Sequence, residues 1–178
     1  MYGICMRYTN DPSEVKDILQ EGFLKVYLKI KQYSGKGSFE GWIKRIMINT
    51  AITQYNKKKN KRHLDIANVK ETLINKEFID DNINSDDDID KDEIDEEIIN
   101  VDVIKKADFS VDELLSVLNI LPAGFRMVFN LYVMENYKHK EIAKKLKIDE
   151  KTSRTRLLRA RKIIQKELYK LSIEKVSK

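Results

Sequence analysis

A helix-turn-helix pattern near the C-terminus constrains the fold of this chain most. Residues 140–164 read KEIAKKLKIDEKTSRTRLLRARKII, two stretches of helical apolar spacing separated by a short turn. In the first stretch Ile142, Ala143 and Leu146 have inward spacing, so two short helices can share one small core. At about 100° per residue, one face of the second stretch is predicted to face that core. Its members are Leu157, Ala160, Ile164 and Leu168, with Ser153 beside them.

The opposite face of the second predicted helix is basic. It carries Lys151, Thr155, Leu158, Arg159 and Lys162, and it is flanked by Arg154 and Arg156. We expect these side chains to be free to enter a DNA groove. Asp149 precedes the helix and is a residue type that caps helix N-termini. The alternative is an ordinary solvated basic helix of a helical domain, because positive charge on a helix does not by itself indicate DNA binding. The apolar pairing across the turn favours DNA binding.

Charge divides the chain into three parts. Residues 1–62 hold 13 basic and 5 acidic residues, residues 63–113 hold 5 and 18, and residues 114–178 hold 16 and 6. A chain of 178 residues can form one or two small domains. With 2 prolines, 6 glycines and a helical apolar period, few strands or none are expected. The sequence therefore predicts an all-α protein with two basic helical domains, residues 1–62 and 114–178, joined by an acidic flexible linker over residues 63–113.

The predicted linker contains the run DDNINSDDDIDKDEIDEE at residues 80–97. Self-repulsion opposes its collapse, so we expect it to be extended when the protein is alone. Five of its acidic residues match ligand positions of a calcium loop: Asp86, Asp88, Asp90, Asp92 and Glu97. However, Lys91 stands where that loop requires glycine, which argues against calcium. The run could instead lie in a basic channel of a partner, imitating nucleic acid.

Composition argues against several classes of site. Cys5 is the single cysteine, so an internal disulfide and a cysteine-rich zinc site are excluded. His63 and His139 are isolated and are interpreted as ordinary surface histidines. A nuclease or recombinase needs clustered carboxylates or an activated nucleophile in a folded domain, whereas the carboxylates here crowd into the linker. No apolar run approaches the roughly 20 residues that span a bilayer, so a cytoplasmic protein is expected. Together with the residue types above, this sequence predicts no catalytic residues, metal or cofactor.

The first long helix of the N-terminal part follows a break at residues 10–13. Apolar residues at three- and four-residue steps predict a broad core-facing stripe: Val15, Ile18, Leu19, Gly22, Phe23, Val26, Tyr27 and Ile30. The outer face mixes polar and apolar side chains: Asp17, Gln20, Glu21, Leu24 and Leu28. A covering loop or helix, or a docking surface for another protein, would each explain the two leucines. Periodicity does not separate these alternatives.

The next helix is predicted over residues 39–62, after the loop YSGKGSF at residues 33–39. Glycine in this loop permits close backbone approach to a ligand. The helix combines Phe39, Trp42 and Tyr55 with cations, a pattern typical of single-stranded nucleic-acid binding, in which bases stack on rings. The alternative is that Phe39 and Trp42 are core residues and that the closing KKKNKR is a solvated helix end.

These blocks resemble the extracytoplasmic-function subgroup of the bacterial sigma-70 family of RNA polymerase sigma factors. DPSEVKDILQEGFLKVY and GKGSFEGWIKRIMINTA resemble the second conserved region, in which an Asp-x-x-Gln-Glu helix precedes Phe-x-x-Trp and a later Asn. LPAGFRMVFNLYVMENYKHKEIAKKLKIDEKTSRTRLLRARK resembles the fourth conserved region, from Leu-Pro through Glu-Ile-Ala to the arginine-rich helix. The resemblance covers residues 1–62 and about 114–170 in the order that the family has.

The resemblance implies binding of the RNA polymerase core and of promoter DNA, with a role for particular residues. The residues that would dock on the polymerase clamp are Asp17, Gln20, Glu21 and Leu24. Those that would hold the unpaired minus-10 strand and its flipped base are Tyr33, Gly35, Lys36, Ser38, Phe39, Arg45 and Asn49. Those that would contact the minus-35 duplex are Lys151, Arg154, Thr155, Leu158 and Arg159. The family linker threads through the RNA exit region of the polymerase, and many members are held by an anti-sigma factor.

Three departures from the family pattern bear on these expectations. The chain starts partway into the family's first helix, so the N-terminal helix is expected to be truncated. Lys147 stands at the turn where glycine is usual, and a lysine enters the left-handed conformation at a cost. Ser153 replaces a core-facing valine. The rival interpretation is a dimeric helix-turn-helix regulator, which would bind a duplex site without polymerase.

Overall fold

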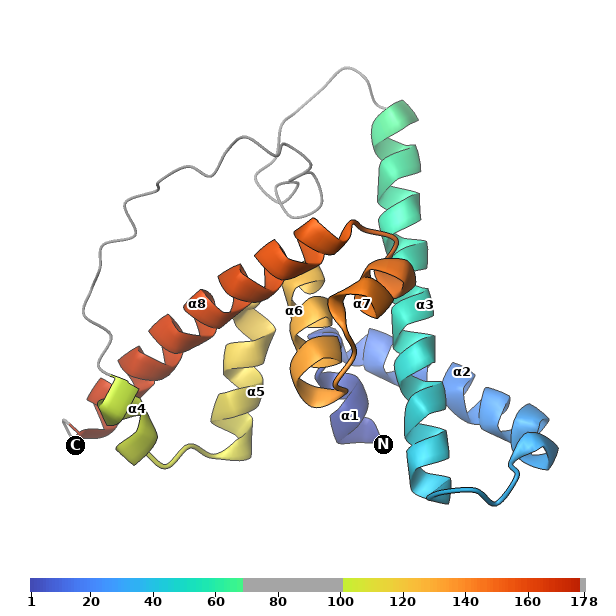
Figure 1. Ribbon diagram of the computed structural model, residues 1–178, viewed down its shortest axis with the longest axis horizontal. Coiled ribbons are helices and arrows are strands. Elements are labelled where there is room, and N and C mark those ends of the chain that lie inside the picture. Colours follow the sequence, from blue (N-terminus) through green and yellow to red (C-terminus); the bar gives the residue numbers. More distant parts are fainter. Residues whose placement is uncertain (69–100, 177–178) are drawn as a thin grey trace.

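The computed structural model describes residues 1–68 and 101–176, and these residues form helices without any strand (Figure 1). The all-α prediction is confirmed. The N-terminal half comprises α1 (Tyr2–Met6), α2 (Pro12–Lys29), the short turn η1 (Ile30–Gln32) and α3 (Phe39–Asn68). The C-terminal half comprises α4 (Val101–Lys106), α5 (Val111–Ile120), α6 (Ala123–Phe129), the π-helical turn η3 (Asn130–Met134), α7 (His139–Leu146) and α8 (Glu150–Val176). The acidic run at 80–97, including the calcium alternative, lies outside the described residues.

The helix starts follow from local chemistry. Asp11 caps α2, because its Oδ1 accepts a hydrogen bond from the Ser13 N–H at 2.8 Å, and Pro12 occupies the first helical position. At α5 the Ser110 side chain accepts from the Glu113 N–H at 3.2 Å, while the Glu113 carboxylate accepts from the Ser110 N–H at 2.7 Å. This reciprocal capping box satisfies two backbone donors that would otherwise lack partners.

The buried stripe of α2 is narrower than its sequence predicted. Val15, Ile18, Gly22 and Val26 are buried, and Leu19 is partly buried. The prediction was wrong for three members, because Phe23, Tyr27 and Ile30 are 49%, 76% and 50% exposed. The physical reason is that α2 packs mainly on a single helix, α3, which covers only the centre of the stripe.

Helices α2 and α3 approach closely at Gly22. A Cβ atom at this position would lie 2.2 Å from the Sδ of Met47 on α3. Any larger residue at this position would therefore require the Met47 side chain to shift.

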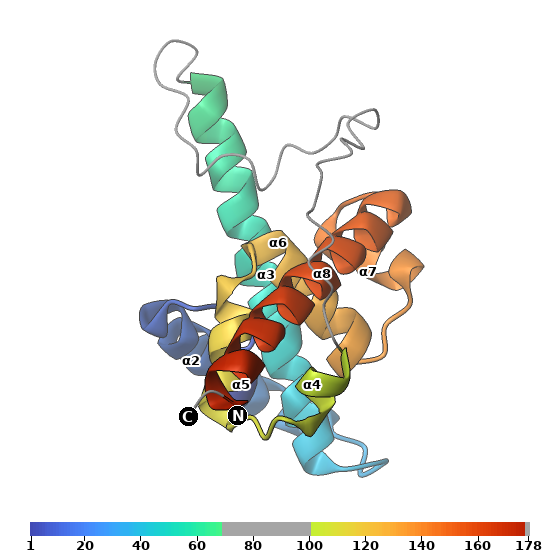
Figure 2. The same cartoon turned by 90° about the vertical axis from the view of Figure 1, so that its left-hand side faces the viewer.

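One hydrophobic core joins the two halves. The N-terminal half contributes Cys5, Tyr8, Val15, Ile18, Met47, Ile48, Ala51 and Ile52, and the C-terminal half contributes Met127, Val128, Leu131, Ile142, Leu146 and Leu157. A second, smaller cluster of Leu118, Leu121, Phe125 and Ala160 lies within the C-terminal half. Figure 1 shows α6 and α7 between α8 and α3, and both views show the C-terminal end of α3 extending beyond the other helices (Figure 2).

Helical structure also occurs at both ends of the segment predicted as a linker. Helix α3 continues to Asn68, α4 spans Val101–Lys106, and α5 begins at Val111. The domain boundaries at residues 62 and 114 stay predictions.

Candidate nucleic-acid interface

Helices α7 and α8 and the turn between them form the expected helix-turn-helix. Lys147 ends α7 with φ 52° and ψ 55°, which is the left-handed conformation expected at this position. The next residue continues the turn, because the Ile148 N–H donates to the Ala143 carbonyl at 3.1 Å. Helix α8 then begins at Glu150, directly after Asp149. Lysine at the turn thus preserves the motif at the cost of a strained backbone.

The core side of α8 contains a polar pair. Ser153, Leu157 and Ala160 are buried as predicted. The Ser153 Oγ lies 2.9 Å from the His139 Nδ1, and the imidazole stacks on Tyr132 with ring centroids 4.6 Å apart. Serine at this core position therefore has a hydrogen-bond partner at the start of α7.

His139 differs from the ordinary surface histidine that its sequence context predicted. It is half-buried between α7 and α8, and burial, together with the nearby Arg154 cation, lowers the pKa of its imidazole below 6.5. The neutral form is therefore favoured in the folded protein. The side chain of His63 lies outside the described residues.

The outward face of α8 is available to a ligand. Lys151, Arg154 and Leu158 are exposed, and Thr155 and Arg159 are partly exposed. The Arg154 guanidinium pairs with Glu150 at 2.5 Å, and the Thr155 hydroxyl donates to the Lys151 carbonyl at 3.2 Å. All five predicted minus-35 residues thus lie on the first half of one helix.

Arg156 is the exception on α8. It was predicted to be free to enter a groove, but it is 5% exposed and its Nη1 donates to the Tyr55 hydroxyl of α3 at 3.4 Å. The prediction was wrong because Arg156 follows Ser153 by three residues, which places it on the inward side of the helix.

The loop between α2 and α3 brings three aromatic rings together. The Tyr33 centroid lies 5.1 Å from Phe39 and 5.6 Å from Trp42, and the latter two rings stack at 5.8 Å. Phe39 is 42% exposed, so its interpretation as a core residue was wrong, whereas Trp42 is partly buried. This cluster offers ring faces beside the exposed Lys36 and Arg45, the combination on which unpaired bases stack.

The backbone of the same loop depends on its glycines. Gly35 and Gly37 have φ angles of 72° and 87°, where a side chain is disfavoured. The Tyr33 hydroxyl donates to the Gly37 carbonyl at 2.7 Å, and the Ser38 Oγ accepts from the Gly41 N–H at 3.3 Å. The loop is therefore closed on itself and continues directly into α3.

Arg45 and Asn49 lie one turn apart on α3, and both are exposed. The Asn49 Oδ1 accepts a hydrogen bond from the Lys145 ammonium of α7 at 3.4 Å. A predicted minus-10 residue is thus in contact with the helix that precedes the predicted minus-35 helix.

The outer face of α2 is exposed in the described part of the chain. Asp17 and Gln20 are exposed, and Leu24 and Leu28 are 58% and 67% exposed. Glu21 has partners instead: its carboxylate pairs with Lys25 at 2.7 Å and accepts from the Gln54 amide at 3.2 Å. The hydrogen bond from Lys25 lowers the pKa of the Glu21 carboxyl. Neither leucine is covered by a described helix or loop, so the covering alternative is not supported in these residues.

Three further polar contacts between the halves were missed by sequence reasoning. The Asn130 amide donates to the Arg7 carbonyl at 2.6 Å, the Asn56 amide donates to the Lys145 carbonyl at 2.8 Å, and Lys44 pairs with Glu135 at 3.0 Å. Their partners are far apart in sequence, so helical periodicity carries no signal of them. Arg126 and Asn130, both buried within the otherwise apolar run from Phe125 to Leu131, were visible hints of buried polar contacts.

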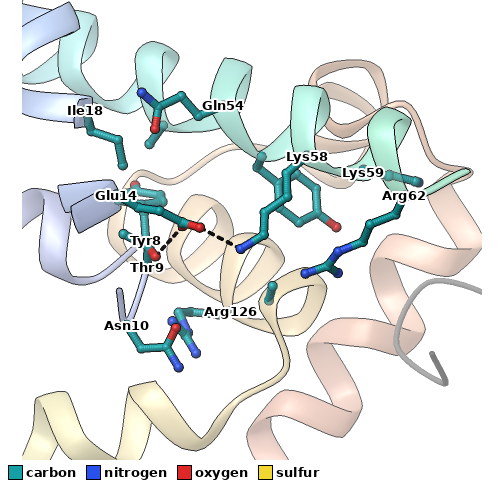
Figure 3. A pocket seen from close by; sticks show the side chains of 13 residues that line it. Tyr8, Thr9, Asn10, Glu14, Ile18, Gln54, Lys58, Lys59, Arg62 and Arg126 are labelled. Atoms are coloured by element: carbon teal, nitrogen blue, oxygen red, sulfur yellow. Dashed lines mark hydrogen bonds and ion pairs between the residues drawn. The ribbon is translucent and has the colours of Figure 1, made fainter. Parts of the chain in front are cut away.

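A pocket of about 180 Å³ lies at the junction of the halves. Figure 3 shows Glu14 in contact with Thr9 and Lys58, with Arg126 approaching from α6. Among the described residues, no group of three or more His, Cys, Asp or Glu side chains could hold a metal ion. No helix in the described ranges is long and apolar enough to cross a membrane.

Comparisons with known proteins match both halves of the chain. The Sigma-70 region 2 model matches residues 1–61, and the Sigma-70, region 4 model matches residues 112–164. The ECF RNA polymerase sigma factor SigW of Bacillus subtilis is 26% identical over 173 residues, covering 96% of this chain and 84% of the relative. The ECF RNA polymerase sigma-E factor of Haemophilus influenzae is 24% identical over 181 residues, covering 95% of this chain and 82% of the relative.

A solved structure has a similar fold. It contains the sigma factor RpoE in complex with the anti-sigma factor NepR from Bartonella quintana. The two chains superpose with a TM-score of 0.50 at 14% identity, covering 94% of this chain and 88% of that chain.

Proposed function

Because this chain belongs to the extracytoplasmic-function subgroup of the sigma-70 family of RNA polymerase sigma factors, we propose that it recruits core polymerase to promoters through three particular surfaces. These are the outer face of α2, the aromatic loop at residues 33–39 with the adjoining face of α3, and the outward face of α8. The comparisons do not favour the rival, a regulator that acts without polymerase. One observation carries the assignment of surfaces: each combines exposed side chains with the chemistry that its partner requires.

The outer face of α2 is the proposed polymerase-binding surface. Its exposed Asp17, Gln20 and Leu24 combine charge, hydrogen bonding and an apolar contact, as protein interfaces do. Glu21 would have to exchange its Lys25 and Gln54 partners for groups on the polymerase.

The aromatic loop is the proposed site for the unpaired minus-10 strand. Stacking of a base on an aromatic ring contributes about 1–3 kcal/mol, which offsets the few kcal/mol that flipping a base costs. Tyr33, Phe39 and Trp42 supply rings, and Lys36 and Arg45 supply cations for phosphates. Asn49 supplies an amide, which can both donate to and accept from a base edge.

The outward face of α8 is the proposed minus-35 surface. Arg159 and Thr155 can hydrogen-bond base edges or phosphates, and Leu158 can contact a thymine methyl group in the major groove. Lys151 and Arg154 add positive charge beside them, and Arg154 would have to leave Glu150 to reach DNA. The factor does no covalent chemistry in this proposal and acts in the cytoplasm with the polymerase. An anti-sigma factor is a further proposed partner, one that would compete for these surfaces.

Run-off transcription tests this function. Purified chain and bacterial core polymerase are incubated with a library of AT-rich promoter fragments, with Asn49→Ala and Arg159→Ala as variants. Loss of one specific DNA contact costs about 1–3 kcal/mol, so each variant should give about 5- to 150-fold less transcript at limiting protein. Lys105→Ala, which removes an exposed cation from α4, is the matched control and should transcribe normally.

Two outcomes contradict the proposal in different ways. If the chain alone selects a duplex site and core polymerase neither binds nor initiates, the regulator interpretation replaces it. If transcription depends on the chain but neither variant differs from Lys105→Ala, the function stands and the assigned promoter contacts are wrong.

A further inference from the structure

The loop between α2 and α3 is anchored at both ends. At its start the Tyr33 N–H donates to the Ile30 carbonyl at 3.1 Å, which ties Tyr33 to the turn that follows α2. At its end the Ser38 carbonyl accepts from the Trp42 N–H at 3.0 Å, in the first turn of α3. Residues 34–37 are therefore the part of the loop that lies between the two anchors.

Two glycines make this middle part of the loop intrinsically flexible. Gly35 and Gly37 have φ angles of 72° and 87°, and glycine loses more conformational freedom than any other residue when a chain is ordered. A Cβ atom added at either position would meet no atom within 4 Å outside its chain neighbours. At these two positions, packing against other described residues therefore does not hold the loop in place.

The side chain of Tyr33 spans this flexible part. Its hydroxyl donates to the Gly37 carbonyl at 2.7 Å, which closes the loop across both glycines. Its ring lies edge-on to Phe39, with centroids 5.1 Å apart, and lies 5.6 Å from the Trp42 ring. Tyr33 is half-buried, whereas residues 34–40 are exposed. Tyr33 therefore connects the loop backbone to the two rings at the start of α3.

The three rings of the cluster are not equivalent as surfaces for a base. Phe39 and Trp42 are nearly parallel, with an interplanar angle of 17°. Phe39 is 42% exposed, whereas Tyr33 and Trp42 are half-buried. A base that stacks on this cluster therefore meets Phe39 first, and the hydroxyl of Tyr33 is already bound to the loop.

We propose that Tyr33 is a positioning residue for the minus-10 strand: its hydroxyl holds the two-glycine loop in the conformation that receives the flipped base, and Phe39 provides the ring on which that base stacks. This inference rests on the proposed function. A loop that is held in its bound conformation beforehand avoids the cost of being ordered when the ligand binds. Tyr33 therefore strengthens the capture of every base by the same factor, because its hydroxyl contacts the loop and not the base.

Nuclear magnetic resonance of the free chain tests whether the hydroxyl holds the loop. Tyr33→Phe removes the hydroxyl and keeps the ring. Backbone order parameters of residues 34–37 should fall from about 0.85, the value of rigid backbone, to below about 0.6. Tyr27→Phe removes the hydroxyl of a 76% exposed tyrosine of α2, and as the matched control it should leave them unchanged. Unchanged order parameters in Tyr33→Phe overturn the proposal.

Binding of an unpaired minus-10 strand to the holoenzyme tests the consequence. A fluorescent single strand carries the non-template sequence of a promoter found by run-off transcription, with each of the four bases in turn at every minus-10 position. Tyr33→Phe should weaken binding about 2- to 10-fold, the effect of one hydrogen bond, and by the same factor for all four bases. Phe39→Leu removes the stacking ring and should weaken binding about 5- to 150-fold. Tyr27→Phe should bind as the wild type does.

Two binding results overturn the proposal. One is a Tyr33→Phe variant whose loop loosens while its affinity for the strand stays at the wild-type value. The other is a Tyr33→Phe variant with an altered base preference, because the hydroxyl would then read the base. Failure of the proposed function is distinguishable from both. Wild-type holoenzyme would then not bind the strand, and this inference would fail with it, although the order parameters would still report whether Tyr33 holds the loop.

Discussion

The two halves differ in how they satisfy their buried polar groups. In the N-terminal half these are Thr9 and Thr50, which donate to Glu14 at 2.6 Å and to the Ile46 carbonyl at 2.9 Å, partners of their own half. The C-terminal half buries Arg126, Asn130, Ser153, Arg156 and Ser172. Two of these, Asn130 and Arg156, donate across the junction to Arg7 and Tyr55.

This difference shows which half depends on the other for the hydrogen bonds of its buried polar groups. If the halves separate, the buried threonines keep their partners, whereas Asn130 and Arg156 lose theirs and must find water. A buried polar group without a partner costs about 1–3 kcal/mol. The packing of the two halves therefore stabilises the C-terminal half more specifically than the N-terminal half, which contributes mainly an apolar surface.

The largest expected effect tests the apolar part of the junction. Leu146→Ala removes a fully buried side chain of α7 that packs in the shared core, and should lower the free energy of unfolding by about 2–5 kcal/mol. Leu24→Ala, at an exposed leucine of α2, should change it by less than about 0.5 kcal/mol. Urea denaturation followed by circular dichroism measures both. Similar small effects of the two substitutions would mean that Leu146 is not buried in the folded chain.

The next prediction concerns Asn130. Asn130→Ala removes the hydrogen bond to the Arg7 carbonyl and should lower the free energy of unfolding by about 1–3 kcal/mol. The cost should be smaller in a Lys44→Glu background, because loss of the Lys44–Glu135 ion pair loosens the same junction. Thr9→Val should cost the same in both backgrounds, because its Glu14 partner is local. A double-mutant cycle measures the coupling, and equal costs for Asn130→Ala in both backgrounds would contradict the asymmetry.

Local features of both halves could be predicted from sequence, but the junction could not. The core side of α8, including Leu157 and Ala160, follows from helical period, and the left-handed Lys147 follows from its place in the turn. Periodicity shows which face of a helix is apolar, but not how much of that face the neighbouring helix covers. For this reason Phe23 was assigned to the core although α3 leaves it exposed.

Arg156 was misassigned because sequence patterns also fail to show the distant partners of polar residues. Its charge predicted a groove-facing side chain, yet the Tyr55 hydroxyl, 101 residues away, accepts from it in the interior. Partners so distant in sequence leave no periodic signal. The proposed polymerase and promoter residues, by contrast, came from matching motifs, and their exposure agrees with those roles without testing them.

A smaller effect should be independent of the junction. Lys147→Gly relieves a left-handed lysine and should raise the free energy of unfolding by about 1 kcal/mol. Lys144→Gly, in the middle of α7, should lower it by about 1 kcal/mol, because glycine is a poor helix former. Both values should be unchanged by Lys44→Glu. A Lys147→Gly effect that changes in the presence of Lys44→Glu would show that the turn is coupled to the N-terminal half.

The smallest expected effect is a dependence of stability on pH, for which each half contributes in a different pH range. The folded state lowers the pKa of His139 below 6.5, so the imidazole binds a proton more weakly when folded than when unfolded. The stability that this contributes is present above pH 6.5 and is lost as pH falls through the folded pKa. At Glu14 burial raises the pKa, but hydrogen bonds from Lys58 and Thr9 outweigh it and leave the pKa below 4.5. The contribution of Glu14 is therefore lost only below pH 4.5. His139→Gln should make the urea midpoint less dependent on pH between pH 7 and 5, and should leave its fall below pH 4.5 unchanged. A wild-type profile that is flat from pH 7 to 5 would show that the pair of His139 with Ser153 does not discriminate between the neutral and charged imidazole.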